Sequence, residues 1–307
     1  MSRAVTISIL TYKRHQHLRR ALASALPYAD QVAEIIVVDN AAEPELKSLL
    51  AAEYPNVRYI AAPSNGGCEG RNIGLRAAGT PIVITLDDDV ELSSSNCITE
   101  VESAFSRDPR LACLNFTVTG VDGRVLEREW CHPRPISHAT REFETHFILE
   151  GACALSREKV LSVGGYPAEF FLGHEGVDLS YRLIGSGCRV VHTPRVSTTH
   201  HAALEHRPDW RVYYYYTRNG IWVAYRSFPP LMAISRVLAY LATMGFFSLR
   251  AMQVAAYLRG CVDGVRGLSR MDRRNLDSAS LRHVREIRSE QVPLLGRIQR
   301  RLREKIL

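Results

Sequence analysis

Apolar and polar positions follow two different periods over the first two thirds of the chain. The runs at 4–10, 34–38 and 81–86 are β-branched and largely apolar, which is typical of strands buried in a parallel sheet. Within 18–26, leucines recur at every fourth position and mark the buried stripe of a helix. Strands and helices that alternate in this way predict an α/β fold, in which helices flank a mostly parallel, Rossmann-like sheet.

The same alternation continues to about residue 195. It predicts further strands at 57–60, 111–119, 147–155 and 189–192, and further helices at 68–78, 98–105 and 178–184. Residues 124–141 are polar and rich in histidine and proline, so we expect a long loop there. Loops of that length near a site are commonly functional.

Long apolar helical stretches begin after residue 211 and indicate a change in organisation. We expect a domain over 1–220, with a nucleotide-binding half at about 1–110 and an acceptor-binding half at about 111–220. A helical C-terminal extension over 221–307 would follow it and face a partner chain, the acceptor or a membrane.

The longest uncharged apolar stretch of that extension, 237–249, has thirteen residues. A membrane-spanning helix needs roughly 20, so we expect this stretch to pack on the sheet domain or to lie in a membrane interface. The amino-terminal apolar run is too short for a secretory signal. The seven cysteines are scattered and form no Cys-x-x-Cys pair, which argues against a disulfide framework or a zinc site. We therefore expect a cytoplasmic protein, with attachment to the membrane surface left open.

The formal net charge of +7 is concentrated near the carboxyl terminus, where residues 282–307 hold eight Lys or Arg against three Glu. Such a tail attracts anionic lipid or nucleic acid, or it forms a solvated helix face. The sequence contains no nucleic-acid-binding module and no aromatic residues interleaved with this charge. We therefore expect no nucleic acid among the partners. A homo-oligomer stays open.

Three consecutive aspartates, Asp87, Asp88 and Asp89, follow the predicted strand at 81–86. The carboxyl ends of parallel strands are where open α/β sheets bind ligands, and three adjacent carboxylates repel one another without a cation. Oxygen ligands suit Mg²⁺ or Mn²⁺, with water and a diphosphate completing the coordination. The alternative is a solvated acidic turn before the next helix, with 93–96 supplying the cap.

Four loops leave the carboxyl ends of successive predicted strands, at 11–14, 39–40, 65–74 and 87–89. In a parallel sheet these ends share one edge, so we expect the loops to converge on one crevice. The guanidinium groups of Arg14 and Arg71 would neutralise a diphosphate there, or form surface ion pairs. Gly66 and Gly67 would let the backbone approach a ligand before a helix amino terminus. The glycine spacing matches neither a dinucleotide fingerprint nor a P-loop, which disfavours a nicotinamide enzyme or a kinase.

The order of these motifs resembles the inverting family-two glycosyltransferases of GT-A fold, and their rhamnosyltransferase-like members in particular. The matching stretches are Thr-Tyr-Lys-Arg at 11–14, Val-Val-Asp-Asn at 37–40, Gly-Arg-Asn-Ile-Gly at 70–74, Leu-Asp-Asp-Asp at 86–89 and Glu-Gly-Val-Asp-Leu-Ser-Tyr-Arg-Leu at 175–183. The resemblance covers residues 4 to about 220.

The resemblance implies a donor site built from these loops. Its substrate-binding residues would be Thr11, Tyr12, Arg14, Asp39, Asn65, Gly66, Gly67, Arg71, Asp87 and Asp88. Among them, Asp39 would read the pyrimidine ring, and Asp87 and Asp88 would face ribose and sugar. Asp89 would bind Mg²⁺ or Mn²⁺, and His200 or His201 would complete the metal or diphosphate site; one of the two histidines could equally be a core residue.

Inverting transfer needs a base that takes the proton of the acceptor hydroxyl. Glu175 is the first candidate and Asp178 the second, because Arg182 stands four residues after Asp178 and would pair with it. The family commonly has Glu-Asp at 175 and 176, and this chain has Gly176 instead. Glu150 and Arg157 would touch the acceptor or pack at strand ends. His174 would orient the base or cap the loop. The tyrosines at 213–216 would stack on a sugar or pack in the core.

The sequence therefore predicts an inverting, metal-assisted glycosyltransferase. The donor would be a UDP- or dTDP-linked sugar such as a rhamnose-like one, and the acceptor a glycan, a lipid-linked glycan or a small molecule. A sugar nucleotidyltransferase is a second interpretation, but it needs a glycine-rich loop after the first strand, and 11–14 contains no glycine. A catalytically silent sugar-nucleotide-binding or scaffold protein is a third, which Gly176 keeps open.

Overall fold

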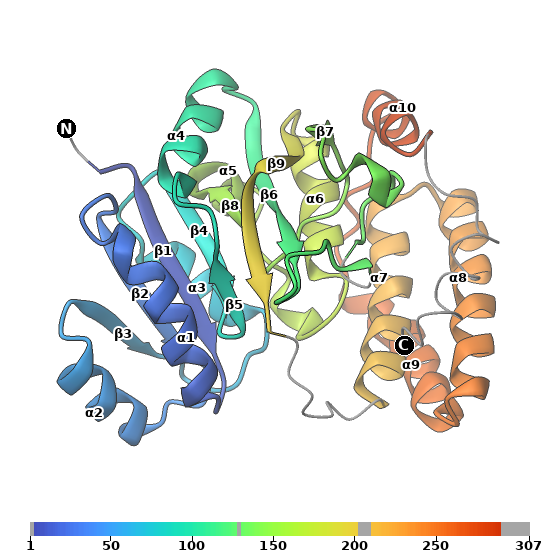
Figure 1. The fold of residues 1–307 in the computed structure, drawn as a ribbon. Helices are drawn as coiled ribbons and strands as arrows, with labels where there is room; N and C mark the ends of the chain where they lie inside the picture. The colour runs from blue at the N-terminus through green and yellow to red at the C-terminus, as the bar shows by residue number, and fades with distance from the viewer. Residues whose placement is uncertain (1–2, 128–129, 202–209, 290–307) are drawn as a thin grey trace.

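The computed structural model describes residues 3–127, 130–201 and 210–289. Figure 1 shows a twisted sheet covered by helices, with further helices stacked against one side of it. The strands are β1 (Val5–Thr11), β2 (Glu34–Asp39), β3 (Val57–Ala61), β4 (Ile82–Asp87), β5 (Val90–Leu92), β6 (Leu111–Thr119), β7 (Phe143–Glu144), β8 (Ala152–Ser156) and β9 (Arg189–His200). The helices are α1 (His15–Ala25), α2 (Pro44–Glu53), α3 (Glu69–Ala77), α4 (Cys97–Arg107), α5 (Arg157–Ser162), α6 (Glu175–Gly185), α7 (Thr217–Ser227), α8 (Pro230–Arg250), α9 (Val254–Gly267) and α10 (Ser278–Ile287).

The first four strands form a parallel unit in the order β3-β2-β1-β4. In its register Thr11 of β1 lies beside Asp39 of β2, and Leu10 lies beside Asp87 of β4. The carboxyl ends of these strands are therefore level, and the loops after them leave the sheet at the same edge. This arrangement confirms the predicted α/β fold.

Beyond β4 the sheet is mixed, in the order β4-β8-β6-β9-β5, and β7 pairs with β9. β8 is antiparallel to β4 and to β6, while β6 and β9 are parallel. β9 is longer than the predicted strand at 189–192 and continues to His200, with a register irregularity against β6 between Asn115 and Thr117. Pro194 lies in this stretch, and a proline in an apolar run normally argues against a strand. The continuation of β9 brings His200 opposite Val90 of β5.

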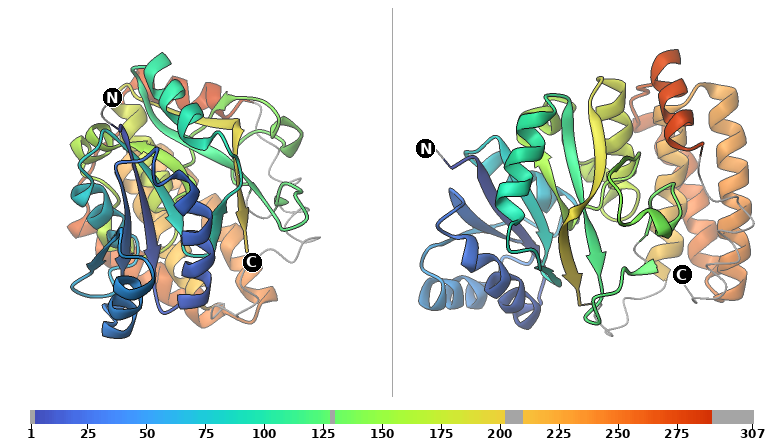
Figure 2. Two further views of the ribbon diagram at one scale, coloured as in Figure 1. Left: turned by 60° about the vertical axis from the view of Figure 1, so that its left-hand side comes forward. Right: turned by 45° about the horizontal axis from the view of Figure 1, so that its top comes forward.

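Two apolar cores cover the two faces of the sheet, and Figure 2 shows helices on both sides. Ile35 and Val37 of β2 face one core, which includes residues of α1, α2 and α4. The alternate residues Ile36 and Val38 face the other core, which includes residues of α3, α5 and α6. Both faces of these strands are thus buried, which explains why the runs are apolar without a polar face.

The helices from α7 onward continue the sheet domain through a third apolar core. Trp222 and Val223 of α7 pack with Tyr181 and Ile184 of α6 in this core. Residue 220, where the expected extension begins, lies within α7. The four tyrosines at 213–216 form a π-helical turn before α7.

α8 spans 21 residues. It is longer than the uncharged apolar stretch at 237–249, because it also includes Arg236. The guanidinium of Arg236 lies 4.1 Å from the centre of the Phe228 ring, so the charge is held against an aromatic face. Among the described helices, α8 alone has the length and composition that crossing a membrane requires, with a mean hydropathy of 1.5 and only 22% of that stretch buried.

Candidate active site

The aspartates at the end of β4 are buried against two arginines. The Thr11 hydroxyl donates to Asp88 Oδ2 at 2.8 Å, and Arg14 Nη1 lies 2.7 Å from Asp89 Oδ2 and 3.4 Å from Asp88 Oδ1. Burial, together with the neighbouring carboxylates, raises the pKa of Asp88 to about 6, although the Thr11 hydroxyl and Arg14 act in the opposite direction. Asp88 and Asp89 are therefore buried and paired, unlike the solvated turn that was the alternative, whereas the Asp87 side chain is 35% exposed.

Arg71 contacts Asp87 and has two further hydrogen-bond donors without a partner among the described residues. Its Nη2 lies 2.6 Å from Asp87 Oδ1, and its side chain is 9% exposed. Its Nε and Nη1 atoms are buried and have no hydrogen-bond partner among the described residues. Buried guanidinium donors without partners are costly, and a phosphate group would satisfy them in a bidentate manner. The geometry thus suits the role that we expected for Arg71 at a diphosphate.

The two histidines at the end of β9 have different surroundings. His200 Nε2 lies 3.4 Å from Asp89 Oδ1, whereas His201 Nε2 lies 2.8 Å from Glu91 Oε1. A carboxylate oxygen and an imidazole nitrogen at that separation can share one cation. Of the two histidines, the structure brings His200 to Asp89, and we keep only His200 in the candidate metal set.

The described residues contain no group of three His, Cys, Asp or Glu side chains that could hold a metal ion. Asp89 and His200 would therefore supply two ligands, and water and diphosphate oxygens the others. Mg²⁺ and similar hard cations commonly keep several water ligands and bind through few carboxylates. The donor set fits Mg²⁺ or Mn²⁺ in this way.

Asp39 organises the loop that follows β2. Its carboxylate accepts hydrogen bonds from the backbone amides of Ala41 and Glu43, both at 2.8 Å, and from the Tyr59 hydroxyl at 3.0 Å. The carboxylate is fully buried and fixes the backbone of the loop after β2. That Asp39 also reads a pyrimidine ring stays a prediction. Tyr12, in contrast, is 42% exposed.

The loop with Asn65, Gly66 and Gly67 is tied to the segment that precedes α6. The Cys68 amide donates to Phe171 O at 2.9 Å, and Asn40 Nδ2 donates to Gly67 O at the same distance. Gly67 has φ +59°, and a Cβ atom there would lie 2.0 Å from Phe171 O. Only glycine fits at position 67 in this close packing. The loop thus lies against the segment that precedes Glu175, the candidate base.

Asp178 is an internal anchor, because two arginines hold it. It is fully buried, with Oδ2 2.8 Å from Arg182 Nε and Oδ1 3.1 Å from Arg226 Nε. These pairs connect α6 to α7 and leave the carboxylate no path to a substrate. We therefore remove Asp178, the second candidate base, from the site.

Glu175 stands in the first turn of α6 and is buried, with Oε2 lacking a hydrogen-bond partner among the described residues. Burial, together with the negative charge of Glu150, raises the pKa of Glu175 to about 8. The preceding residue, His174, has a left-handed backbone, and its Nε2 lies 2.8 Å from the Tyr240 hydroxyl of α8. Within the described part of the chain, Glu175 thus has one unpaired carboxylate oxygen and a raised proton affinity, which are properties of a general-base candidate.

Two further expectations can be compared with position. Arg157 stands at the far end of β8, where its guanidinium donates to Leu75 O at 2.9 Å, which favours strand-end packing over an acceptor contact. Two tyrosines of the π-helical turn have packing contacts, since Tyr213 is buried and Tyr214 donates to Asp263 at 2.9 Å, whereas the ring of Tyr216 lies 5.1 Å from that of His174.

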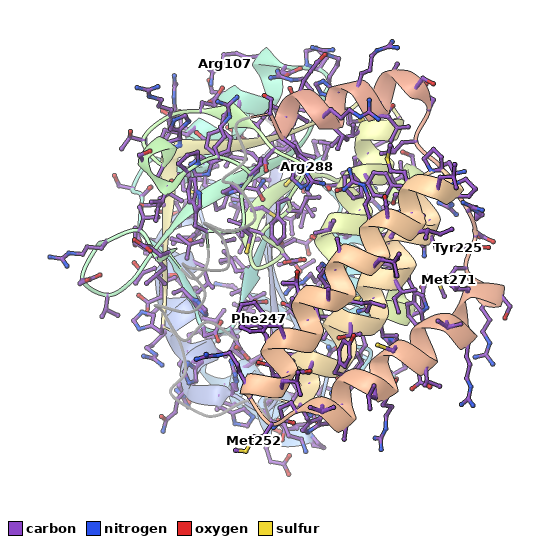
Figure 3. All side chains as sticks on the ribbon, turned by 90° about the vertical axis from the view of Figure 1, so that its right-hand side faces the viewer. Arg107, Tyr225, Phe247, Met252, Met271 and Arg288 are labelled. Atoms are coloured by element: carbon purple, nitrogen blue, oxygen red, sulfur yellow. The ribbon has the colours of Figure 1, made fainter. Side chains whose placement is uncertain are left out.

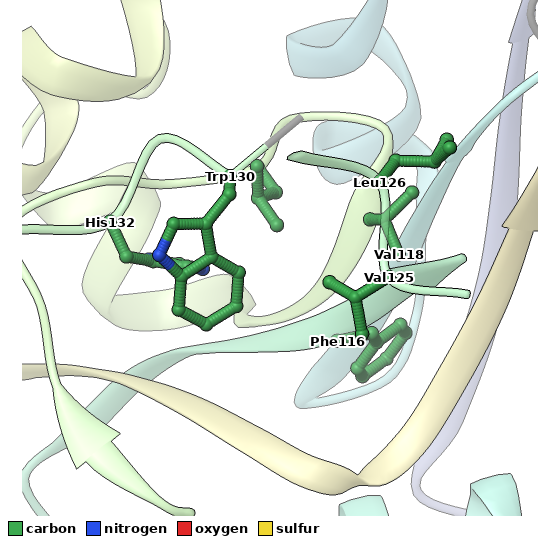
Figure 4. Close-up of a pocket in the computed structure, with 7 residues that line it drawn as sticks. Phe116, Val118, Val125, Leu126, Trp130 and His132 are labelled. Carbon is green, nitrogen blue, oxygen red and sulfur yellow. The ribbon is translucent and has the colours of Figure 1, made fainter. Parts of the chain in front are cut away.

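A small hollow lies between β6 and the loop after it (Figure 4). It is lined by Phe116, Val118, Val125, Leu126, Trp130, His132 and Leu149. The lining is apolar and holds no carboxylate, so this hollow is unsuited to a diphosphate or a cation.

Comparisons with known proteins agree with this geometry. The family model for glycosyl transferase family 2 matches residues 6–164, more than half of the chain. The chain belongs to that family, and it is a nucleotide-sugar-dependent glycosyltransferase of GT-A fold.

Among curated proteins, it is 28% identical over 239 residues to N-acetylglucosaminyl-diphospho-decaprenol L-rhamnosyltransferase of Mycobacterium tuberculosis, covering 66% of this chain and 78% of that one. It is 32% identical over 124 residues to the succinoglycan biosynthesis protein ExoO of Rhizobium meliloti, covering 40% of this chain and 36% of that one.

Solved structures share the fold at low sequence identity. GalNAc-T7 with UDP, GalNAc and Mn²⁺ has a TM-score of 0.62 at 16% identity, over 78% of this chain and 51% of that one. The mannosyltransferase PcManGT of Pyrobaculum calidifontis, with GDP-Man and Mn²⁺, has a TM-score of 0.59 at 16% identity, over 86% and 88%. S. aureus TarS 1–349 with UDP-GlcNAc has a TM-score of 0.59 at 15% identity, over 87% and 82%.

Proposed function

We propose that this glycosyltransferase transfers a deoxyhexose such as rhamnose from a UDP- or dTDP-linked donor, with inversion, to a hydroxyl of a lipid-diphosphate-linked sugar. The observation that carries the proposal is the pairing of Asp89 with His200 and of Asp87 with Arg71 at the end of β4, with Glu175 at the start of α6. The named activity of the mycobacterial relative supports the choice of sugar and acceptor.

The donor would bind where the charges are already arranged for it. The free Nε and Nη1 donors of Arg71 would bind diphosphate oxygens, and Asp89 and His200 would hold Mg²⁺ or Mn²⁺. When bound, such an ion neutralises the charge that develops on the leaving diphosphate. Thr11 and Arg14 hold the carboxylate of Asp88 in place beside it.

Glu175 would act as the general base. Its carboxylate takes the proton of the acceptor hydroxyl while the acceptor oxygen bonds to the anomeric carbon. The bond from that carbon to the diphosphate oxygen breaks in the same displacement, and the configuration inverts because attack and departure occur on opposite faces. The raised pKa of Glu175 strengthens its carboxylate as a proton acceptor. The residue acts as a base in its deprotonated form, whose share grows as the pH rises toward about 8.

The direct test supplies UDP- and dTDP-sugars, Mn²⁺ and a polyprenyl-diphosphate-linked N-acetylglucosamine, and measures both nucleotide diphosphate release and the glycolipid product. We expect release that depends on donor, acceptor and metal, with the anomeric configuration inverted in the product. Release with none of these donors, or a product of retained configuration, would overturn the proposal.

We also propose that α8 and α9 rest on the cytoplasmic face of an anionic membrane. Exposed apolar side chains recur along α8 and the turn after it, and they are Leu231, Ile234, Leu238, Phe246, Leu249 and Met252. Leu231 is 85% exposed and Met252 89% exposed, and in Figure 3 Met252 lies at the end of α8. A row of this kind is typical of helices that lie in a membrane interface.

The charge of this region favours a lipid surface. Residues 230–270 contain five arginines and one acidic residue, Asp263, which accepts a hydrogen bond from the Tyr214 hydroxyl. Arg250, Arg259 and Arg266 are exposed beside the apolar row. Such arginines attract anionic headgroups, whereas two copies of this positive face would repel each other. A lipid-linked acceptor would also be presented at that surface.

A further inference from the structure

The carboxylate of Glu150 occupies the space that a side chain at residue 176 would need. The amide of Gly176 donates to Glu150 Oε1 at 2.8 Å. A Cβ atom at 176 would lie 2.4 Å from that same oxygen and 2.5 Å from Ile148 O. Glycine is therefore required at 176 both by the Glu150 carboxylate and by the backbone carbonyl of Ile148.

The position of Glu150 is fixed from the other side by β4. The Thr85 hydroxyl donates to Glu150 O at 2.7 Å, and the Asp87 amide donates to Gly151 O at 3.2 Å. A Cβ atom at Gly151 would lie 2.4 Å from Asp87 Cγ, so the backbone of this segment lies directly against the aspartate triplet. Glu150 thus bridges the end of β4 and the amino terminus of α6, where the helix dipole favours a negative charge.

Glu150 and Glu175 influence each other's charge. Burial raises the pKa of both carboxyls, and the charge of Glu150 is the largest further cause for Glu175. Arg71 favours the charged form of both, and Asp87 disfavours it. The other titratable groups that face the pair are Cys68, Cys113, Tyr166 and Tyr216.

We infer that Glu150 is a positioning residue which supplies the second carboxylate beside Glu175, replacing a side chain at 176, and which orients the first turn of α6. This inference rests on the proposed function, in which Glu175 is the base. Glu150 acts through Glu175 and the Gly176 amide, and Arg71 balances the two negative charges. Gly176 lets the Glu150 carboxylate reach the first turn of α6, and the site keeps a pair of carboxylates.

A double-mutant cycle tests the contact. Glu150→Gly and Gly176→Asp should each lower kcat/KM for transfer by about 10²-fold, which is within the range of a general-base contribution. The double variant, Glu150→Gly with Gly176→Asp, should lie within about tenfold of the weaker single variant, because both changes remove the same contact between the Glu150 carboxylate and the Gly176 amide. UDP binding should be the same in all four proteins. A double variant whose loss is the product of the two single losses would overturn the inference.

A pH titration separates this role from a merely structural one. Glu150→Gln removes a like charge beside Glu175, so the Glu175 proton should leave at a lower pH, and the midpoint of kcat/KM against pH should fall from about 8. Carboxyl ¹³C NMR of Glu175 reads the same shift without turnover. An unmoved midpoint in the NMR titration would overturn the inference. A shifted midpoint in a protein that transfers no sugar would support the coupling and overturn the proposed function alone.

Discussion

The predicted crevice at the edge of the sheet and the outer face of α8 differ in opposite ways from the usual pattern of buried apolar and exposed polar side chains. In the crevice, Asp88, Asp89 and Glu175 are buried although they carry or can carry charge. On α8, Leu231 and Leu249 are exposed although they are apolar. Buried charge needs a partner and large exposed apolar patches mark contact surfaces, so each region indicates its own ligand. The crevice suits an anionic donor with a cation, and the helix face suits lipid.

Removing the base should give the largest loss in the crevice. Glu175→Gln should lower kcat by about 10²- to 10⁴-fold, because a general base contributes that much, while the Kd for the donor nucleotide stays the same. Glu158→Gln is the matched control, since Glu158 is also in the first turn of a helix but is exposed. Equal activity of the Glu175 variant and this control would exclude Glu175 as the base.

Asp178→Asn tests whether the buried charge of Asp178 stabilises the fold, in contrast to Glu175, which we propose acts as the base. It leaves Arg182 and Arg226 without their shared partner in the interior, and we expect the free energy of unfolding to fall by about 3–5 kcal/mol. Urea denaturation measures this change. The folded variant should bind donor nucleotide normally; normal stability with lost transfer would return Asp178 to the site.

The two histidines at the end of β9 allow a comparison within the crevice. His200→Ala should weaken Mn²⁺ binding in the presence of UDP by at least about tenfold, since it removes a nitrogen ligand at Asp89. His201→Ala should bind Mn²⁺ normally, because His201 is 2.8 Å from Glu91. Electron paramagnetic resonance of free Mn²⁺ measures both variants. The reverse outcome would place His201 in the metal set.

The helix face should give a smaller effect. The triple variant Leu231→Ser, Leu238→Ser and Leu249→Ser should bind phosphatidylglycerol vesicles about tenfold more weakly, since each exposed leucine loses apolar contact with lipid. Val121→Ser is the matched control, because Val121 is 77% exposed outside this face. Transfer to a short, water-soluble acceptor should be unchanged in the triple variant.

Cosedimentation with vesicles and light scattering in solution distinguish the occupants of this face. Binding to phosphatidylglycerol but not phosphatidylcholine vesicles supports the lipid contact. A dimer that the triple variant converts to monomer, without vesicle binding, would assign the face to a second copy of the chain.

The donor half of the molecule was predictable from the sequence because its strands carry their own signal. Both faces of β1, β2 and β4 are buried, so the runs are apolar throughout, and the polar residues at their ends had to converge. The proximity of Arg71 to the aspartate triplet was expected from that topology, whereas the roles of these residues toward a donor stay predictions. Local pattern and tertiary arrangement agree there.

The acceptor half was less predictable because its contacts are distant in the chain. Pro194 interrupts the β9 pattern, although the strand continues to His200. Gly176 and Glu150 meet across 26 positions, and nothing near either residue indicates the contact. The exposure of α8 could not be decided from the sequence, since an apolar run has the same appearance whether it meets protein or lipid.

The Tyr240 hydroxyl of α8 donates to Tyr216 O at 3.1 Å and lies 2.8 Å from His174 Nε2, immediately before the proposed base. Arg226 of α7 also reaches Asp178 inside α6. The carboxyl-terminal helices are therefore not an interchangeable module. A chimaera that takes these helices from another family member would need matching residues at 226 and 240. Without them, the first turns of α6 would lose two of the contacts that hold them.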